Sequence, residues 1–392
     1  MHIKSVQYAQ YPDSPQEWIL EECMFGNINL IAGKNASGKS KTLNVILSLS
    51  KYLSIEKTTQ TLFGDCTYKI TFDNEGKEII YTLSLENQKV IEEQLQVGGE
   101  LLLKRGRGGF GQIKFERVSP EQNSLLDFQT PEEDVAAFTR RDSIQHPFLE
   151  DLYQWGKNLM HFQFGTSLGK EGFAIFLKKD RAEPIDYRNT NQPALIFKRG
   201  RDEFGSSFVE AVKTNMRRVG YALEEVDIGP PISVKFTFQG YPPPSEPVQG
   251  LFVKEADLQG ITDQNDMSQG MFRALCVVIY VTYGAMVARP SCILIDDIGE
   301  GLDYERSGNL MRLLLEKAEE SNIQLIMSTN DRYAMNNVSL RYWSIANRER
   351  NKVTLISCHN RPKVFDDFDL TGLTNFDFFS SNYFLNPSDR RN

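Results

Sequence analysis

The chain has 392 residues and a formal net charge of −8, with 40% hydrophobic and 24% charged residues. These values predict a soluble globular protein with an ample core, built as one elaborated α/β domain or as roughly two or three domains. A net-negative protein does not bind nucleic acid over its whole surface, so any such contact is expected to be local.

No targeting signal, histidine cluster or CxxC zinc motif stands out along the chain. It has no run of about 18 apolar residues and no signal peptide, so we expect a cytoplasmic protein without membrane contact. The four histidines are scattered and the five cysteines form no CxxC pair, which argues against a histidine-based or CxxC zinc site and for buried thiols in a reducing compartment. The cysteines are Cys23, Cys66, Cys276, Cys292 and Cys358.

The first fifty residues contain a phosphate-binding pattern. Residues 3–8 and 18–24 are predicted strands, and the apolar run 28–32 is a short buried strand. It is followed by GKNASGKS, which fits G-x-x-x-x-G-K-[ST], and by an amphipathic helix at 42–47. This order of strand, loop and helix favours a phosphate-binding loop over a glycine turn that merely begins a helix.

In such a loop, backbone N–H groups and the helix N-terminus bind the phosphates. Lys39 is expected to reach the β- and γ-phosphates, and the Ser40 hydroxyl to ligate Mg²⁺. The predicted ATP-binding residues of the loop are Gly33, Asn35, Ala36, Ser37, Gly38, Lys39, Ser40, Lys41 and Thr42.

The middle of the chain is less informative. Apolar runs between residues 66 and 116 are separated by turns at 74–76, 87–88 and 98–99, which predicts an antiparallel meander. Residues 131–164 are predicted to be helical, and their apolar cluster 160–164 is predicted to be core and not a base-stacking platform.

A mixed region then extends to about residue 260. It contains a predicted helix at 208–219, a predicted strand at 234–238 and three prolines, Pro242 to Pro244, that predict an exposed loop. Basic runs are the candidates for local nucleic-acid contact, although such runs are more often solvated turns. They are 104–107, 178–181, 198–201 and 348–352.

A second informative block begins at Ser268. Ser268, Gly270 and Arg273 begin an apolar helix, for which Ser268 is a good N-cap. The apolar run 292–296 is a predicted strand that ends in Asp296 and Asp297, the Walker B arrangement that holds nucleotide-bound Mg²⁺.

The block continues as a loop, a helix and a strand. The loop 299–303 contains Glu300 and Asp303, the helix is predicted at 306–319, and the strand 323–328 ends at Thr329-Asn330-Asp331. Two acidic residues at a strand end are ambiguous alone, but after a phosphate-binding loop they indicate ATP chemistry.

Together these motifs resemble those of ABC-type ATPases. Walker A, an S-x-G-x-x-R signature, a strand ending in two aspartates, a G-L-D loop and a strand ending in T-N-D occur in the order typical of that family. Gly38 and Ser268 are separated by a wide interval, and in this the chain resembles the RecF, SMC and Rad50 branch more than transporter subunits. It also resembles the stand-alone AAA-type ATPases of bacterial anti-phage defence systems.

The resemblance implies an α/β P-loop NTPase, an ABC-ATPase head with an N-terminal antiparallel β lobe and an inserted helical lid. The expected division is an ATPase core at 1–60 and 260–392, a β lobe at 61–125 and a lid at 126–259. The interval between the motifs is too short for a long SMC coiled coil and lacks the zinc-hook CxxC of Rad50.

The resemblance also implies that ATP and Mg²⁺ are bound between two subunits. Ser40 and Asp296 would hold the metal, Ser268 and Gly270 of the other chain would close over the γ-phosphate, and Asp303 would lie at the dimer seam. The partners implied are a second copy of the chain, in a dimer or a larger even oligomer, and an effector or sensor protein.

Three positions are the candidates for catalysis. The family usually has Glu where Asp297 stands, to orient the attacking water, and a switch histidine where Asn330 stands. Glu300 is the next candidate for the water-orienting group. A displacement of about 1 Å can cost on the order of a hundredfold in rate, so both departures predict slow hydrolysis.

Two functions from different classes follow from these expectations. The first is a nucleotide-dependent dimer switch that holds or releases a partner protein, in prokaryotic anti-phage defence. The second is a RecF-like DNA-repair ATPase that clamps a duplex. The acidic net charge and the altered hydrolytic positions favour the switch.

Overall fold

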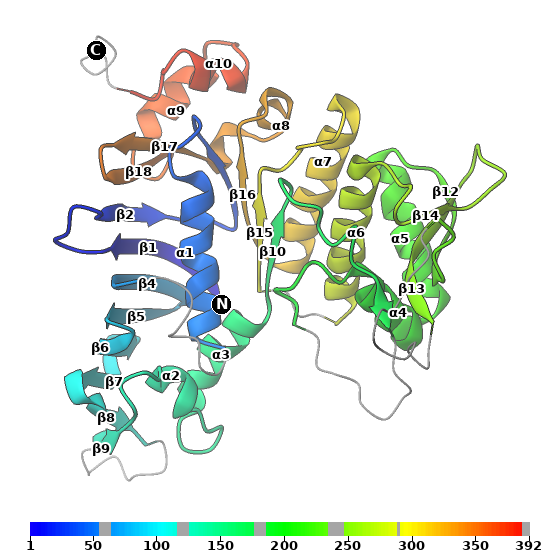
Figure 1. Cartoon of the computed structure of the whole chain (residues 1–392). Helices are drawn as coiled ribbons and strands as arrows, with labels where there is room; N and C mark the ends of the chain where they lie inside the picture. The colour runs from blue at the N-terminus through cyan, green and yellow to red at the C-terminus, as the bar shows by residue number, and fades with distance from the viewer. Residues whose placement is uncertain (55–63, 116–124, 176–185, 234–246, 288–290, 386–392) are drawn as a thin grey trace. The chain divides into compact units, whose positions relative to one another are not determined.

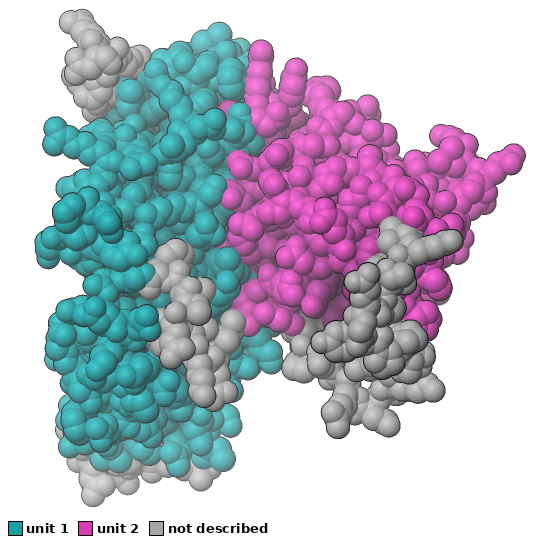
Figure 2. All heavy atoms as spheres, in the orientation of Figure 1, with its two compact units in different colours: residues 1–159, 324–330, 338–392 teal, residues 160–323, 331–337 magenta. Residues whose placement is uncertain are grey.

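The structure is a computed structural model that describes residues 1–54, 64–115, 125–175, 186–233, 247–287 and 291–385. It divides into two compact units, coloured in Figure 2. Unit 1 comprises Met1–Leu159, Gln324–Asn330 and Val338–Asn392, and unit 2 comprises Met160–Ile323 and Asp331–Asn337. The predicted strand 234–238, the three prolines and the basic run 178–181 lie outside the described residues.

Unit 1 is built on one large sheet (Figure 1). Its order is β16-β3-β17-β18-β2-β1-β4-β5-β6-β7-β8-β9. The strands are β1 (His2–Gln10), β2 (Trp18–Met24), β3 (Ile28–Ala32), β4 (Cys66–Asn74), β5 (Lys77–Glu86), β6 (Lys89–Val97), β7 (Glu100–Gly106), β8 (Phe110–Lys114), β9 (Leu125–Gln129), β16 (Gln324–Thr329), β17 (Trp343–Glu349) and β18 (Lys352–Ser357).

Strand β3 lies at the centre of the parallel part of this sheet. It pairs in parallel with β16 on one side and with β17 on the other. All five of its residues are buried, as expected of a strand covered on both faces. The buried side chain of Gln324 links the start of β16 to β1, because it accepts from Ile3 N at 2.8 Å and donates to Ile3 O at 2.7 Å.

The second half of the sheet is the predicted antiparallel meander. Strands β4 to β9 pair antiparallel in sequence order. Three of its turns have two residues with positive φ between the paired ends, which is the geometry of a type I′ hairpin. They are Glu75-Gly76, Asn87-Gln88 and Gly98-Gly99.

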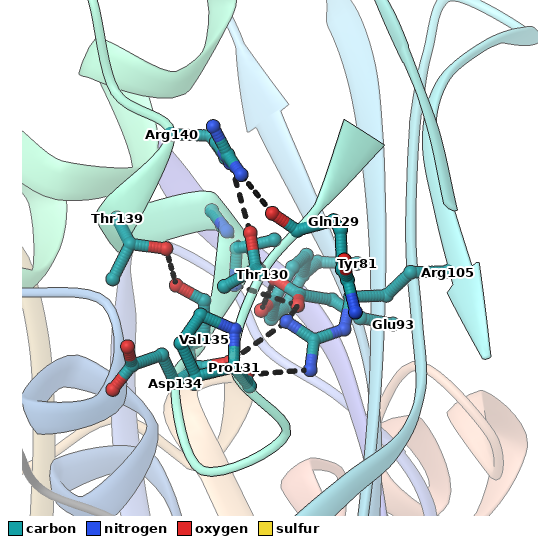
Figure 3. A network of polar contacts seen from close by, with 12 residues as sticks. Tyr81, Glu93, Arg105, Gln129, Thr130, Pro131, Asp134, Val135, Thr139 and Arg140 are labelled. Carbon is teal, nitrogen blue, oxygen red and sulfur yellow. Dashed lines mark hydrogen bonds and ion pairs between the residues drawn. The ribbon is translucent and has the colours of Figure 1, made fainter. Parts of the chain in front are cut away.

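A buried network of hydrogen bonds and one ion pair links residues 130–140, which follow β9, to this meander (Figure 3). Glu93 on β6 accepts from the backbone N–H groups of Ala136 and Ala137 at 2.8 and 2.7 Å and from the Tyr81 hydroxyl at 2.9 Å. Arg105 on β7 lies 3.8 Å from the Glu93 carboxylate and donates to Asp134 O at 2.8 Å. Both charged side chains are fully buried, so the hydrogen bonds and the opposite charge offset their loss of water.

Helices α1 and α3 of unit 1 pack against each other. Helix α1 lies across one face of the sheet (Figure 1), and Gly156 of α3 approaches α1 so closely that a Cβ there would lie 2.6 Å from Ser50 O. The helical segments are α1 (Lys39–Tyr52), η1 (Arg107–Gly109), α2 (Ala136–Thr139), η2 (Pro147–Leu149), α3 (Glu150–Lys157), η3 (Leu340–Tyr342), α9 (Pro362–Asp369) and α10 (Asn375–Ser380).

Unit 2 combines a helical layer with two sets of strands. Strand β10 lies beside β15, and the smaller sheet has the order β11-β13-β12, with β14 paired to β13. Its elements are β10 (Leu159–Gln163), β11 (Ala174–Ile175), α4 (Pro193–Phe204), α5 (Ser206–Val219), β12 (Leu223–Gly229), β13 (Val248–Glu255), β14 (Thr262–Asp263), α6 (Gln269–Val287), β15 (Cys292–Asp296), α7 (Tyr304–Ser321) and α8 (Arg332–Asn336).

Helix α6 is apolar on all sides. Among the described residues it alone is long and apolar enough to cross a membrane by length and composition, but most of it is buried inside the protein. A helix that is hydrophobic all round and buried is a core helix.

One prediction of secondary structure was wrong. The helical stretch predicted for 131–164 contains α2 and α3 but ends as strand β10. A short apolar run does not distinguish a buried strand from a buried helix by its periodicity, and β10 is buried at four of its five residues. The cluster 160–164 is core as predicted, since Met160, Phe162 and Phe164 are fully buried.

Candidate functional site: a phosphate loop and a signature helix

The phosphate loop connects β3 to α1 in unit 1. Ala36 and Gly38 adopt positive φ angles of 61° and 105°, so the backbone curls into a concave turn whose N–H groups suit an anion. Both pattern glycines are required by this geometry. A Cβ on Gly33 would lie 2.5 Å from Ser37 Oγ, and one on Gly38 would lie 3.0 Å from Val353 Cγ2.

Lys39 lies inside the loop. Its side chain is buried, and Nζ donates to Gly33 O at 2.9 Å and to Lys34 O at 3.2 Å. Two carbonyl groups therefore hold a buried ammonium where the pattern places phosphate. The Thr42 hydroxyl donates to Gly38 O at 3.0 Å, so it supports the turn itself.

Ser37 provides an independent sign that the loop fits a phosphate. Its hydroxyl oxygen is buried and has no hydrogen-bond partner among the described residues. An unpaired buried hydroxyl costs free energy, and phosphate oxygens in this loop would pair with it. The residues present therefore fit a nucleotide phosphate.

Asn330 joins the end of β16 to the phosphate loop. Its Nδ2 donates to Asn35 Oδ1 at 3.1 Å, and both residues belong to unit 1. The residue predicted at the switch-histidine position therefore contacts the loop, through a pair of side chains separated by 295 positions in the sequence.

Arg348 and Trp18 also lie at the loop, and sequence reasoning did not assign them to the site. Arg348 on β17 donates from Nη1 to Ala36 O at 3.2 Å. Lys41 Nζ lies 4.1 Å from the centre of the Trp18 ring, a cation–π contact. Burial, and then the charge of Arg348, lower the pKa of Lys41 from its usual value. The only sequence signal was the basic run that contains Arg348.

The Walker B residues end strand β15 in unit 2. Asp296 is buried, and its carbonyl oxygen accepts from Phe164 N at 3.0 Å, which joins it to the end of β10. Asp297 is partly exposed and has a positive φ of 53°, an uncommon backbone conformation for a non-glycine residue. Glu300 is exposed in the loop that follows.

The signature residues begin α6 beside that loop. Ser268 is exposed and accepts from Met271 N at 3.1 Å, which confirms it as the N-cap. Gly270 packs directly on the loop, because a Cβ there would lie 2.4 Å from Gly301 O. Arg273 is buried and donates to Glu300 O at 2.7 Å and to Thr166 O at 3.1 Å.

Asp303 caps the next helix. It accepts from Arg306 N at 3.0 Å and pairs with Arg306 Nη1 at 2.6 Å. These bonds lower the pKa of Asp303 from its usual value, so it is a carboxylate at neutral pH. Ser268, Gly270, Asp297, Glu300 and Asp303 are therefore brought together within unit 2.

Gln264, just before the signature helix, is a further residue that sequence reasoning missed. It is fully buried, accepts from Leu251 N at 3.0 Å and donates to Lys170 O at 2.8 Å and to Gly172 O at 2.7 Å. These bonds stabilise the turn at 169–172 from the residues that precede α6. A single glutamine belongs to no motif, so nothing in the sequence indicated these contacts.

Comparison with protein-family models and with curated proteins finds no match. Solved structures do match. The crystal structure of an SmcHead bound to the C-winged helix domain of ScpA has a TM-score of 0.51 at 13% identity, covering 93% of this chain and 100% of that chain. An Smc head domain with an extended coiled coil, bound to the C-terminal domain of ScpA derived from Pyrococcus furiosus, has a TM-score of 0.50 at 11% identity, covering 94% and 99%.

The fold is that of an SMC head. The predicted mixed α/β fold of a P-loop ABC-type ATPase is thereby confirmed. At these identities the likeness concerns the fold alone. The roles of the site residues, including the binding of Mg²⁺ by Ser40 and Asp296, and the division into core, β lobe and lid remain predictions.

Two of the four basic runs, 104–107 and 198–201, are largely neutralised. Acidic partners pair with Lys198, Arg199 and Arg201 in the run 198–201, while in the run 104–107 Arg105 is buried beside Glu93 and Arg107 pairs with Glu86. These charges are therefore not available as a phosphate-binding patch.

The described residues contain no group of three or more His, Cys, Asp or Glu side chains that could hold a metal ion. Four of the five cysteines are buried as predicted, and Cys358 is partly exposed. Burial raises the pKa of Cys66 to about 12, so this thiol is protonated and unreactive at neutral pH.

Proposed function

We propose that this chain is an ATP-binding and slowly ATP-hydrolysing ABC-type ATPase that acts as a nucleotide-dependent dimer switch. The single observation that carries the proposal is the phosphate loop, in which buried Lys39 and the unpaired Ser37 hydroxyl lie in a turn built by positive φ angles. The SMC-head fold supports the same activity.

In this proposal the residues of the chain have separate tasks. Lys39 binds the β- and γ-phosphates, and Ser40 with Asp296 holds Mg²⁺, which neutralises phosphate charge. Asp297 orients the attacking water and accepts its proton, with Glu300 as the alternative. The shorter side chain of Asp297 and the amide at Asn330 make hydrolysis slow, because water is held less well in line.

We further propose a two-fold homodimer, in which Ser268 and Gly270 complete the phosphate site of the neighbouring chain. Ser268 is exposed at the N-terminus of α6, where a hydroxyl and a helix dipole both favour an anion. One chain carries one phosphate loop and one signature, so two composite sites require two copies.

The proposed output is the holding or release of a partner protein, in prokaryotic anti-phage defence. Two structures of similar fold contain a head bound to part of ScpA, which supports a protein as the partner class. The defence setting rests on the resemblance of the motifs. The neutralised runs 104–107 and 198–201 disfavour the alternative, a DNA-clamping ATPase.

ATP binding is tested by Lys39→Ala. We expect the parent protein to bind Mg²⁺-ATP in isothermal titration calorimetry and Lys39→Ala to lose that binding, since the buried ammonium is the main positive charge in the loop. Lys69→Ala, which removes an exposed lysine from β4, is the matched control and should bind normally. Equal affinity of the parent and Lys39→Ala would refute the proposed site.

Sharing of sites between chains is tested by mixing. Ser268→Arg places a bulky cation at the signature and should block closure while leaving ATP bound through Lys39. In a heterodimer of Ser268→Arg with Lys39→Ala, one composite site carries both defects and the other carries none. Partial recovery of ATPase activity on mixing supports shared sites, whereas a protein that stays monomeric with ATP and Mg²⁺ contradicts the dimer.

A further inference from the structure

Arg306, at the start of α7, is held on three sides. Its guanidinium lies 4.4 Å from the centre of the Tyr221 ring. Its Nε donates to Gly220 O at 3.4 Å, and its Nη1 pairs with Asp303 Oδ2 at 2.6 Å. The guanidinium therefore has a defined place beside the carboxylate of the G-L-D loop.

The end of helix α5 forms the platform for this arginine. Gly220 ends α5 in the left-handed conformation, with a φ of 111°, and a Cβ there would lie 3.3 Å from Arg306 Cγ. Asn309, one turn further along α7, donates to Val219 O at 3.3 Å. Arg306 and Asn309 of α7 thus both bond to the last turn of α5, and these contacts fix the orientation of the Arg306 side chain.

The Arg306–Asp303 pair contributes little to stability by itself. Its side chains are 40% and 50% exposed, and ion pairs of this exposure are typically worth less than about 1 kcal/mol. Asp303 is already held as the N-cap by the backbone N–H of Arg306. The fold thus orients Arg306 although its ion pair adds little to the free energy of unfolding. This indicates that the charge of Arg306 has another function.

We propose that Arg306 is a positioning residue that neutralises Asp303 where two copies of the chain meet across nucleotide phosphates. This inference rests on the proposed function. Asp303 lies in the loop predicted to form the dimer seam, where each triphosphate brings several negative charges. An unpaired carboxylate there would repel the phosphates and the partner's own loop, and Arg306 removes that repulsion before closure.

The test is the strength of dimerisation, measured by sedimentation velocity with Mg²⁺ and a slowly hydrolysed ATP analogue. Arg306→Gln should weaken dimerisation about tenfold while binding of the nucleotide by the monomer is unchanged. The loss should shrink at about 0.5 M salt, because salt screens repulsion between exposed charges. Arg306→Met, which keeps the apolar stem over Tyr221, replaces the Gln variant if that variant does not fold.

The decisive variant is Arg306→Gln combined with Asp303→Asn. Asparagine still caps α7 but carries no charge, so the double variant should recover to within about twofold of the parent. A purely structural role for Arg306 predicts no recovery. The matched control is Arg341→Gln, which removes another arginine that stacks on a tyrosine, 4.5 Å from the centre of the Tyr342 ring, and should dimerise normally.

The outcomes separate this inference from the proposed function. If the parent binds the analogue but stays monomeric, the dimer switch fails and the role of Arg306 fails with it. If the parent dimerises but Asp303→Asn gives no recovery, or if Arg306→Gln dimerises normally, only the role of Arg306 is wrong.

Discussion

The Asn330 side chain at the end of β16 donates to the Asn35 side chain of the phosphate loop, across a distance of 3.1 Å. The loop that carries Lys39 is therefore linked to the residue at the predicted switch-histidine position. An amide at this position supports the loop through a hydrogen bond but does not exchange a proton at neutral pH.

Replacing this amide should weaken nucleotide binding. Asn330→Leu removes the bond to Asn35 while keeping the number and branching of the side-chain heavy atoms, and we expect about a 3- to 10-fold loss of Mg²⁺-ATP affinity, the effect of one hydrogen bond. Calorimetric titration measures it. Asn336→Leu, at the end of α8, is a control for the substitution, and an unchanged affinity of Asn330→Leu would show that the bond does not support the loop.

Asp297→Asn should separate binding from hydrolysis. The amide cannot accept the proton of the attacking water, so we expect unchanged ATP affinity with a rate of phosphate release at least about 10²-fold lower. The ATP-bound dimer should then accumulate in sedimentation velocity. If Asp297→Asn hydrolyses ATP at the parental rate, Glu300→Gln becomes the variant to measure.

Gly270 should not tolerate a side chain, because it packs against the 299–303 loop of the same chain. A Cβ at this position would lie 2.4 Å from Gly301 O, so Gly270→Ala must displace the loop that carries Glu300 and Asp303. We expect a loss of about 1–3 kcal/mol in unfolding free energy, as for other overpacked sites. Thermal denaturation measures it against Gly260→Ala, whose Cβ would meet nothing within 4 Å. Equal midpoints would contradict the packing argument.

The buried pair in Figure 3 should give the meander a pH-dependent stability. Burial raises the pKa of Glu93 from its usual value, and Arg105 opposes that rise. Arg105→Met leaves the carboxylate buried without its counter-charge and should cost about 3–5 kcal/mol at pH 7. The folded protein then binds the Glu93 proton more tightly than the unfolded chain does, so the variant should regain stability as the pH falls below 7.

Hydrogen exchange of the β6 and β7 amides at several pH values measures this effect locally. The double variant Arg105→Met with Glu93→Gln is the control, because it has no carboxylate to titrate and should lose the added pH dependence. An Arg105→Met protein whose deficit is the same at pH 5 and pH 7 would show that Glu93 does not carry the effect.

The local parts of the fold could be predicted from the sequence because local physics determines them. The loop between β3 and α1 requires two glycines at fixed spacing, and the three hairpins that join β4 to β7 each require two residues that accept positive φ. Strand β10 was missed because a run of five residues with only three apolar side chains suits either a strand or a helix.

The sequence did not reveal some contacts at the site, because they join residues that are far apart in the sequence. Arg348 meets Ala36, and Gln264 satisfies carbonyl groups of the turn at 169–172, through contacts that leave no periodic pattern. The basic run that contains Arg348 suggested nucleic acid, whereas one of its members supports the phosphate loop.

The position of β3 between β16 and β17 has a consequence for biosynthesis. The phosphate loop leaves the ribosome early, but both strands that flank its supporting strand are made from the last quarter of the chain. Contacts between residues so far apart in sequence form late. Both edges of β3 therefore stay unpaired until β16 and β17 have been translated. A chain that ends before Trp343 would lack one flank of β3, so premature termination should yield aggregation-prone fragments and not a weakly active enzyme.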